Sequence, residues 1–314
     1  MTTPRSRLAP SPTGALHLGN ARTFLWNWAL ARTRGWSLVM RIEDFDGPRI
    51  RAGAGESAMD TLRWLGLDWD DEPLVQSSDR TPYLERMDAL AEAGLAYQCH
   101  LTRREIGSEA AAPNEGDHEL VFPADLRPEE AGDSLPFQWR EGSHWRFMTE
   151  SGHHESVHDQ ISGVHDFEPA SECGDFVVWT VRDEPAYQLA VVADDIRQGI
   201  TDVVRGDDLL ASSARQQLLY KAFRSDPPRW WHMPLVRGAD GRRLAKRHGD
   251  TRLDHYRDAG VPPEKILGLL AWWCGLISCR EPITKEDFLE AFDASRLPPK
   301  DVVYSHEDET WLTS

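Results

Sequence analysis

Long apolar runs, paired cysteines and internal repeats are absent from this sequence of 314 residues. No stretch approaches the ~20 apolar residues that a membrane-spanning helix needs. The first residues show no basic-then-apolar leader pattern, so we expect a cytoplasmic protein that does not interact with membranes. Four cysteines form no Cys-x-x-Cys pair: Cys99, Cys173, Cys274 and Cys279. A cytoplasmic chain of this size needs no disulfides.

Acidic residues are in excess, and the formal net charge is −17. An acidic chain argues at first against a nucleic-acid partner. The charge is uneven, however, because residues 103–172 hold 16 acidic and five basic residues. Between Arg237 and Arg252, by contrast, there are six basic residues and two acidic ones. An acidic segment and a basic loop can coexist on a protein that binds phosphates at one place only. With 40% hydrophobic residues and 13 Trp, the chain is a foldable globular protein.

The N-terminal third alternates strand-like and helix-like segments. Residues 5–12 predict a short strand that runs into a Pro-rich turn, residues 15–35 an amphipathic helix, and residues 36–44 a buried strand. A second helix and strand are predicted within 81–99. This strand–helix–strand order favours a parallel α/β sheet.

The pattern changes from about Thr102 to Cys173, where short strand-like pieces such as SHWRFMT and ESVHDQIS replace helices. We interpret this segment as a β-containing insertion. Beyond it, AYQLAVVADDI predicts a return to a core strand, followed by a helix over 209–223 and a strand in WWHMPLVRG. The two C-terminal segments PPEKILGLLAWWCGL and KEDFLEAF are predicted to be helical.

A first chemical motif, His17, Leu18, Gly19 and Asn20, opens the first predicted helix. The free N–H groups and the positive end of a helix attract anions, and a glycine lets another group approach the backbone closely. We therefore expect His17 and Asn20 to bind phosphate oxygens. Taken alone, the tetrapeptide also fits an ordinary solvated first turn.

The second motif is a basic loop, Arg-Leu-Ala-Lys-Arg at 243–247, bounded by glycines. A mobile cationic loop can close over a polyphosphate and stabilise the charge that develops as pyrophosphate leaves. The alternative is a solvated basic loop without a ligand.

Together the two motifs resemble the signatures of class I aminoacyl-tRNA synthetases, usually written HIGH and KMSKS. Longer blocks narrow the resemblance to the glutamyl-tRNA synthetases: RLAPSPTGALHLGNARTFLWNWALAR and LVMRIEDFD resemble their start, and AYQLAVVADDIRQGITDVVRGDDLLASSARQQLLY resembles their second half. The resemblance covers most of residues 5–252. It implies an α/β fold, a Rossmann-like parallel sheet split by a β-containing insertion and followed by a helical C-terminal region.

The resemblance also implies domain boundaries. Residues 1–98 and 174–238 would form the two halves of the catalytic domain, 99–173 the acidic insertion in place of a zinc-binding, acceptor-type region, and 239–314 the signature loop with helices. Only about 60 residues follow the basic loop, too few for the anticodon-binding domain of longer family members. This length is similar to the branch of the family that attaches glutamate to queuosine in the anticodon loop of tRNA(Asp).

At matching positions, the resemblance implies a site for L-glutamate. Arg7 and Arg205 would bind its carboxylates, since an Arg fork donates two parallel charge-assisted hydrogen bonds. Glu43 would bind the α-ammonium group, and Tyr187 would close the pocket. The remaining residues of this set form the segment Leu8, Ala9, Pro10 and Ser11. Each has a structural alternative: Arg7 could pair with a structural acid, Glu43 could cap a turn, and Tyr187 could be core.

For the nucleotide, the resemblance implies ATP with Mg²⁺. The residues expected to bind ATP are His17, Gly19, Asn20, Arg243 and Lys246, with catalytic roles for His17, Asn20 and Lys246. Adenylation needs no protein nucleophile, because positioning and cations around the phosphoryl group supply the catalysis. The expected partners are L-glutamate, ATP and tRNA, and we expect a monomer.

The chain departs from the family pattern at two places. In the loop, Arg243 replaces the first signature lysine and Ala245 the serine. At the zinc site of the family, Cys99 remains, but Leu101, Phe122 and Leu126 occupy the other three ligand positions. Because structural zinc needs four N, S or O donors, we expect no metal there and apolar packing instead. The histidines 153, 154 and 158 are a less favoured alternative metal site.

Three functions stay open. The leading one is glutamate transfer to queuosine, and the second is a minimal glutamyl-tRNA synthetase that charges a tRNA 3′ end. The third is an inert paralogue that binds glutamate, ATP or tRNA without chemistry, which the altered loop and lost zinc ligands would favour.

Overall fold

The computed structural model describes residues 3–314 apart from 46–49, 103, 107–120, 243 and 245–249. Two groups of strands build its centre. The first group is parallel throughout, in the order β1 (Arg5–Leu8), β2 (Ser37–Ile42) and β3 (Leu74–Val75). Five of the six residues of β2 are buried, which is typical of a parallel strand covered on both faces.

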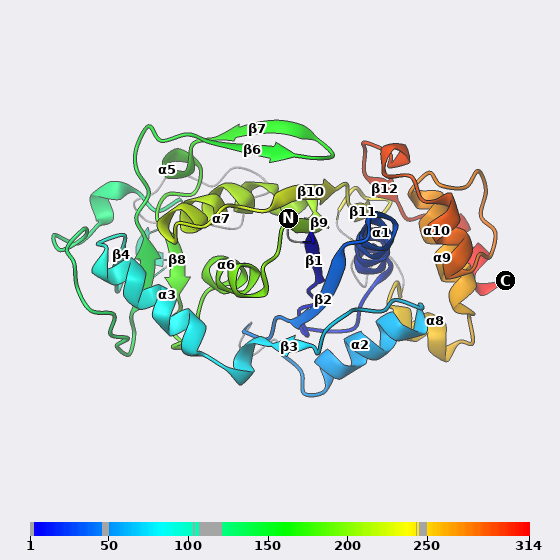
Figure 1. The fold of residues 1–314 in the computed structure, drawn as a ribbon, viewed down its shortest axis with the longest axis horizontal. Helices are drawn as coiled ribbons and strands as arrows, with labels where there is room; N and C mark the ends of the chain where they lie inside the picture. The colour runs from blue at the N-terminus through cyan, green and yellow to red at the C-terminus, as the bar shows by residue number, and fades with distance from the viewer. Residues whose placement is uncertain (1–2, 46–49, 103, 107–120, 243, 245–249) are drawn as a thin grey trace.

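The second group has the order β7-β6-β10-β9. Its strands are β6 (Glu155–Asp159), β7 (Gly163–Phe167), β9 (Asp202–Gly206) and β10 (Arg229–Met233). Only the β6–β7 hairpin is antiparallel. The backbone N–H of Thr201 donates to the Arg5 carbonyl at 2.9 Å, so β9 runs beside β1 and the two groups are neighbours (Figure 1). The predicted α/β fold with a parallel sheet is thus confirmed.

Helix α1 (Leu18–Arg34) connects β1 to β2. It ends at Gly35, whose φ of 66° places it in the left-handed region and whose N–H caps the Ala31 and Arg32 carbonyls. Most of its apolar residues, including Trp26 and Leu25, are buried in the core, and Phe24 is partly buried. The predicted helix over 15–35 is therefore confirmed, although it begins at Leu18, a few residues after the Pro-rich turn.

One predicted element is wrong. Residues 186–196 were expected to form a strand, but Tyr187–Gln198 form helix α6. Eight of its residues, 188–195, are buried, and the five from Leu189 to Ala193 form a short continuous apolar run, which a buried strand also has. Gly199, with φ of 64°, ends the helix. Figure 1 shows α6 between the central strands and the β4–β8 end of the molecule.

The segment expected to be an insertion is distributed over two sheets. Strands β4 (Ala96–Cys99), β5 (His144–Phe147) and β8 (Phe176–Trp179) form a separate antiparallel sheet. Strand β6, in contrast, joins the central sheet, where Trp230 of β10 is its partner at Asp159. Residues of this segment therefore reach the middle of the molecule. Helices α3 (Thr81–Glu92) and α5 (Pro169–Glu172) flank this end.

The remaining helices lie on two sides of the central strands, and α9 and α10 pack against α1. Helix α7 (Leu210–Ala222) contacts α6 and β6. On the other side lie α2 (Ala54–Trp64), α8 (Leu253–Asp258), α9 (Pro263–Trp273), α10 (Lys285–Ala291) and α11 (His306–Thr313), with the short pair β11 (Val236–Arg237) and β12 (Val302–Val303). The predicted helical character of 262–276 and 285–292 is confirmed in α9 and α10. None of the helices in the described ranges is long and apolar enough to cross a lipid bilayer.

Candidate active site

The opening turn of α1 is built by the first motif. The imidazole Nδ1 of His17 accepts hydrogen bonds from the backbone N–H groups of Gly19 (3.1 Å) and Asn20 (3.4 Å). In return, the Asn20 side-chain oxygen accepts from the His17 backbone N–H at 3.2 Å. This reciprocal capping box fixes the orientation of the His17 ring at the positive end of the helix.

Gly19 is required by the same arrangement. A Cβ at this position would lie 3.0 Å from two atoms of the His17 ring and 3.6 Å from the Cβ of Val236. The contact with Val236 is an ordinary one, but the position admits a side chain only if the imidazole of His17 shifts. The group that approaches the Gly19 backbone closely in this structure is the imidazole ring of His17.

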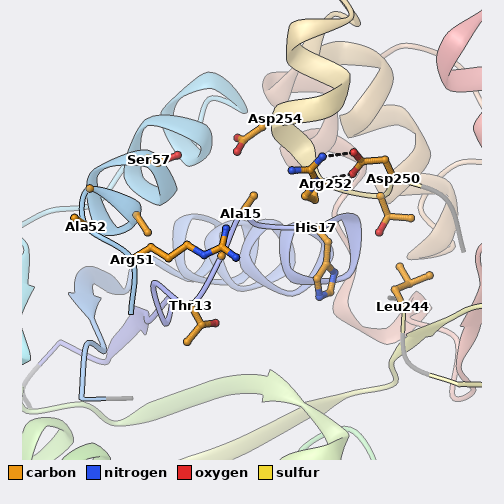
Figure 2. Close-up of a pocket in the computed structure, with 14 residues that line it drawn as sticks. Thr13, Ala15, His17, Arg51, Ala52, Ser57, Leu244, Asp250, Arg252 and Asp254 are labelled. Carbon is orange, nitrogen blue, oxygen red and sulfur yellow. Dashed lines mark hydrogen bonds and ion pairs between the residues drawn. The ribbon is translucent and has the colours of Figure 1, made fainter. Parts of the chain in front are cut away.

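A cavity of about 550 Å³ opens beside His17. Figure 2 shows His17 and Leu244 at one end of it and Arg51 and Ser57 at the other. Its polar lining also includes Thr13, Asp250, Thr251, Arg252 and Asp254. Since Leu244 belongs to the basic loop, the structure brings the two chemical motifs to one cavity.

Backbone hydrogen bonds hold the chain after the loop against the start of α1. The Leu18 N–H donates to the Thr251 carbonyl at 3.0 Å, and the Leu253 N–H donates to the Leu16 carbonyl at 2.8 Å. The second signature is therefore anchored beside the first within a few residues of its end. Arg243 and Lys246 lie outside the described residues, so their predicted roles stay predictions.

A second cavity, of about 740 Å³, lies between the central sheet and the β4–β5–β8 sheet. Its lining includes three residues of the predicted glutamate set, Ser11, Glu43 and Tyr187. Further polar lining comes from Gln76, Thr102, His144, Arg146, Thr180, Arg182 and Gln188. Tyr187 begins α6 and leaves 40% of its surface exposed, so it is a wall residue rather than the core residue of the structural alternative.

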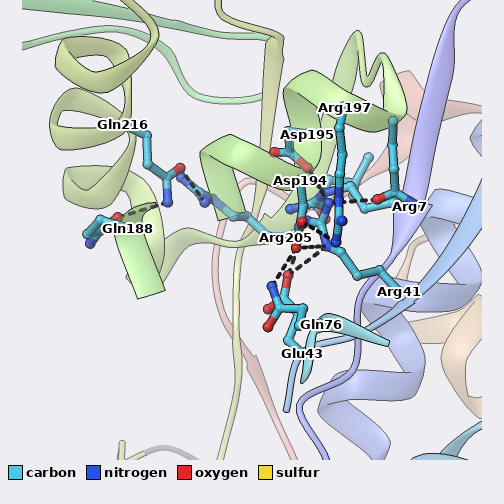
Figure 3. Close-up of polar contacts among 12 residues, drawn as sticks. Arg7, Arg41, Glu43, Gln76, Gln188, Asp194, Asp195, Arg197, Arg205 and Gln216 are labelled. Atoms are coloured by element: carbon cyan, nitrogen blue, oxygen red, sulfur yellow. Dashed lines mark hydrogen bonds and ion pairs between the residues drawn. The ribbon is translucent and has the colours of Figure 1, made fainter. Parts of the chain in front are cut away.

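Glu43 belongs to a buried ion network that sequence reasoning missed (Figure 3). The guanidinium of Arg41, which is wholly buried, donates to Glu43 at 3.1 Å and to Asp195 of α6 at 2.8 Å. Asp194 is 3.8 Å from Arg41 and 2.7 Å from Arg197. Burial raises the pKa of Glu43 above its usual value, although the charge of Arg41 opposes this.

Arg7 lies beside Asp195 of this network. It is 5% exposed, its Nη1 donates to the Val204 carbonyl at 3.2 Å, and its Nε is 3.4 Å from Asp195. The geometry to Asp195 is not that of a hydrogen bond, and Nε has no hydrogen-bond partner. Arg7 therefore does pair loosely with a structural acid, as the alternative interpretation proposed, yet keeps an unused donor.

Arg205 differs from Arg7 and Arg41, the two buried arginines of the ion network, because it contacts only neutral acceptors. Its Nη1 donates to Gln216 at 2.9 Å, and its Nη2 donates to Ser213 at 2.7 Å and to the Leu209 carbonyl at 3.2 Å. Its Nε donates to His232 at 3.0 Å. Within the described part of the chain, no carboxylate forms an ion pair with it. Burial accordingly lowers the pKa of this guanidinium.

Of the predicted glutamate residues, Ser11, Glu43 and Tyr187 line the second cavity, whereas the buried Arg7 and Arg205 are not among its lining residues. Arg205 is joined to the cavity wall through Gln216 and Gln188. The charges of Arg205, Glu43 and Arg7 all act on the Tyr187 hydroxyl, and the Glu43 backbone N–H donates to the Pro10 carbonyl at 3.1 Å. Ala9 is partly buried and Ser11 exposed. The Leu8 side chain is buried in the core, so this residue can offer only its backbone to a ligand.

The four positions of the family zinc site form an apolar cluster. Cys99 and Phe122 are buried together with Tyr97 and Ile106, and Leu101 and Leu126 pack against them. The apolar packing predicted there is present. In the described ranges, no three His, Cys, Asp or Glu side chains are grouped as metal ligands. The histidines of the alternative metal site have separate surroundings. His153 pairs with Glu155 at 2.6 Å, and His158 lies exposed on β6.

A parallel sheet whose first helix opens on a capped His-Leu-Gly-Asn turn, with a basic signature loop anchored beside it, is the architecture of a class I aminoacyl-tRNA synthetase catalytic domain. Comparisons with known proteins agree. The family described as tRNA synthetases class I (E and Q), catalytic domain, matches residues 4–308. This chain belongs to that family.

Within this family, the chain is similar to the following individual proteins. A glutamyl-Q tRNA(Asp) synthetase of Rhodopirellula baltica is 42% identical, across 97% of this chain and 95% of that protein. Glutamate–tRNA ligase 2 of Halorhodospira halophila is 35% identical, across 99% of this chain and 66% of that protein. The crystal structure of the glutamate–tRNA synthetase of Elizabethkingia anophelis superposes with a TM-score of 0.80 at 25% identity, covering 99% of this chain and 70% of that one.

Proposed function

We propose that the protein activates L-glutamate with ATP and transfers the glutamyl group to queuosine in the anticodon loop of tRNA(Asp). The observation that carries the glutamate assignment is Arg205, a buried guanidinium whose neutral contacts leave its charge without a counter-ion in the described ranges. A buried cation without a partner is costly, and a substrate carboxylate supplies the partner. The assignment of queuosine rests on the relatives, of which the more similar carry that name.

In this proposal, ATP binds at the cavity beside His17 and glutamate binds at the second cavity, and the two react where they meet. The glutamate α-carboxylate attacks the α-phosphorus of ATP, forming glutamyl-adenylate and releasing pyrophosphate. A hydroxyl of the queuosine cyclopentene diol then attacks the glutamyl carbonyl, and AMP leaves. His17 and Asn20 would bind phosphate oxygens at the start of α1, and Lys246 of the signature loop would offset charge on the departing pyrophosphate.

Mg²⁺ accompanies ATP in this proposal and supplies charge neutralisation on the phosphates. The carboxylates near His17 are already in use, because Asp250 forms an ion pair with Arg252 and Asp254 accepts a hydrogen bond from Thr61. The ion would therefore be held mainly by phosphate oxygens and water rather than by a protein cage, which suits its preference for retained water.

The test has two stages. Purified protein with ATP and glutamate, with and without tRNA, should release pyrophosphate in a glutamate-dependent way, and no turnover under either condition would favour an inert paralogue. Radiolabelled glutamate is then offered to two forms of tRNA(Asp), one with queuosine and one with guanosine at that position. Both carry the same 3′ end, so label on the queuosine form alone supports the proposal.

A minimal glutamyl-tRNA synthetase is the second candidate, since relatives at 34–35% identity are named glutamate–tRNA ligases. That enzyme would label both tRNA forms equally. Periodate alone cannot distinguish the products, because it cleaves both the cyclopentene diol and the 3′-terminal diol. The labelled tRNA is therefore digested to nucleosides, and the labelled nucleoside is identified by mass.

A further inference from the structure

A buried chain of side chains leads from the β6–β7 hairpin to Arg205. The first member is Asp159, the last residue of β6, and the second is His232 in β10. One carboxylate oxygen of Asp159 lies 2.8 Å from His232 Nδ1 and accepts the His232 backbone N–H at 2.9 Å. On the opposite edge of the ring, His232 Nε2 receives the Arg205 Nε–H at 3.0 Å. His232 is 1% exposed.

The protonation state of His232 follows from its contacts with Asp159 and Arg205, and the Ser213 hydroxyl, 3.2 Å from Nε2, can donate to the same nitrogen. An arginine Nε carries a proton at all accessible pH values and can only donate, so His232 Nε2 must be the unprotonated acceptor. The ring proton then resides on Nδ1 and is donated to Asp159. The imidazole is therefore neutral, in agreement with burial lowering the pKa of His232 to about 4.

Asp159 is firmly held in turn. Its other oxygen accepts the backbone N–H groups of Ile161 (3.0 Å) and Ser162 (2.8 Å) and the Ser162 hydroxyl (2.9 Å). Burial alone would raise the pKa of this carboxyl, but the hydrogen bonds from His232 and Ser162 bring it below its usual value. A charged carboxylate thus fixes the imidazole, and the imidazole presents a neutral acceptor to Arg205.

The order Asp159, His232, Arg205 determines how much of the positive charge on Arg205 is neutralised. A carboxylate in direct contact with Arg205 would neutralise it and compete with a substrate carboxylate. The imidazole places the negative charge one ring farther away and still aligns the guanidinium plane, which also lies over the Trp230 ring at 4.8 Å. We propose that Asp159 and His232 are positioning residues that orient Arg205 for a carboxylate of glutamate while leaving its charge unpaired. The inference rests on the proposed function.

Two amide variants of His232 separate this role from a structural one. Glutamine in His232→Gln can place an oxygen near the position of Nε2 and accept from Arg205, whereas asparagine in His232→Asn keeps a donor near Asp159 but does not reach Arg205. Both lose the ring, and asparagine, which is one methylene shorter, leaves the larger void, so thermal stability is measured alongside binding. His158→Asn, an exposed change on the same strand as Asp159, is the control.

The measurements are the Kd of L-glutamate by calorimetry, the KM values for glutamate and ATP in pyrophosphate release, and thermal stability. We expect His232→Asn to weaken glutamate binding about tenfold or more, the loss of roughly one hydrogen bond to a charged group. The KM for ATP should stay within about twofold, and His232→Gln should restore most of the glutamate affinity. The control should match the wild type.

The outcomes separate the two hypotheses. If the wild-type chain fails to bind glutamate, the proposed function is wrong. If the wild type binds glutamate and both amide variants lose affinity equally, in step with their melting temperatures, the positioning role is wrong. Should His232→Asn not fold, Asp159→Asn is measured in its place. It keeps the shape but removes the charge that fixes the ring, and an unchanged glutamate Kd would then overturn the inference.

Discussion

Replacing Arg205 with lysine tests the central claim about the amino-acid site. The guanidinium donates to four acceptors at 2.7–3.2 Å, whereas an ammonium group has three donors and no planar fork. Lysine thus keeps the charge but loses the geometry. The loss of a charge-assisted hydrogen bond costs ~1.5–3 kcal/mol, so we expect the glutamate Kd of Arg205→Lys to rise about ten- to hundredfold.

Thermal unfolding with added glutamate provides the assay. Glutamate at about 100 times its Kd should stabilise the wild type by ~2.7 kcal/mol, and for a chain of this length that corresponds to a shift of ~4 °C in Tm. At the same concentration, a variant with hundredfold weaker binding gains only ~0.4 kcal/mol, a shift below ~1 °C.

The control for this prediction is Arg229→Lys. Arg229 lies on the neighbouring strand β10, exposes half its side chain and forms an ion pair with Asp202 at 2.8 Å. It should keep the full glutamate-induced shift. A wild-type shift in Arg205→Lys would refute the reasoning, because the unpaired buried guanidinium would then have no part in binding glutamate.

Three further predictions concern the network, the helix start and pH. Arg41→Met should lower the free energy of unfolding in urea by about 3–5 kcal/mol, because it leaves buried carboxylates uncompensated; a loss below ~1 kcal/mol would contradict the network. Gly19→Ala should displace the packed imidazole and raise the KM for ATP while leaving the Kd of glutamate unchanged, and equal effects on both ligands would argue against a separate nucleotide site. His144 and His232 have pKa values lowered by burial to about 4. Because the unfolded chain binds their protons below about pH 6.5 and the folded chain does not, stability should fall as pH drops from 6.5 to 4. His144→Gln should flatten that slope by about one proton in urea titrations at several pH values, and an unchanged slope would refute the assignment.

Sequence patterns predicted the first βαβ unit well because each boundary has a local cause. The His17 cap and Gly35 stop mark the ends of α1 within the sequence itself. Helix α6 has no exposed polar face to reveal its period, since residues 188–195 are all buried. A helical spacing is present in the sequence all the same. Gln188 and Asp195 are seven residues apart, about two helical turns, and accept hydrogen bonds from Gln216 and Arg41.

The candidate site was predictable only in part, for a different reason. Arg7, Glu43, Tyr187 and Arg205 were proposed from the family resemblance, and in the structure Glu43 and Tyr187 line one cavity while Arg7 and Arg205 are buried. Arg41 was missed, since its partner Asp195 is 154 residues away and no local pattern joins a strand residue to a distant helix. The same holds for His232 and Asp159, which are 73 residues apart. Interactions of this kind follow from strand order, which the sequence pattern did not specify.

The charge balance around the amino-acid site explains how the fold can favour glutamate over its neutral amide. The carboxylates of the buried network are Glu43, Asp194 and Asp195, and the guanidinium groups beside them are Arg7, Arg41, Arg197 and Arg205. Among these groups, three negative and four positive charges leave one positive charge in excess, and the further buried carboxylate, Asp159, reaches Arg205 only through the neutral ring of His232. Glutamate carries one net negative charge and completes the balance, whereas glutamine carries none. Since an unpaired charge in a low-dielectric site is costly, glutamine would leave that cost in place, and the charge balance of the network thus adds to the selectivity that the unpaired Arg205 provides.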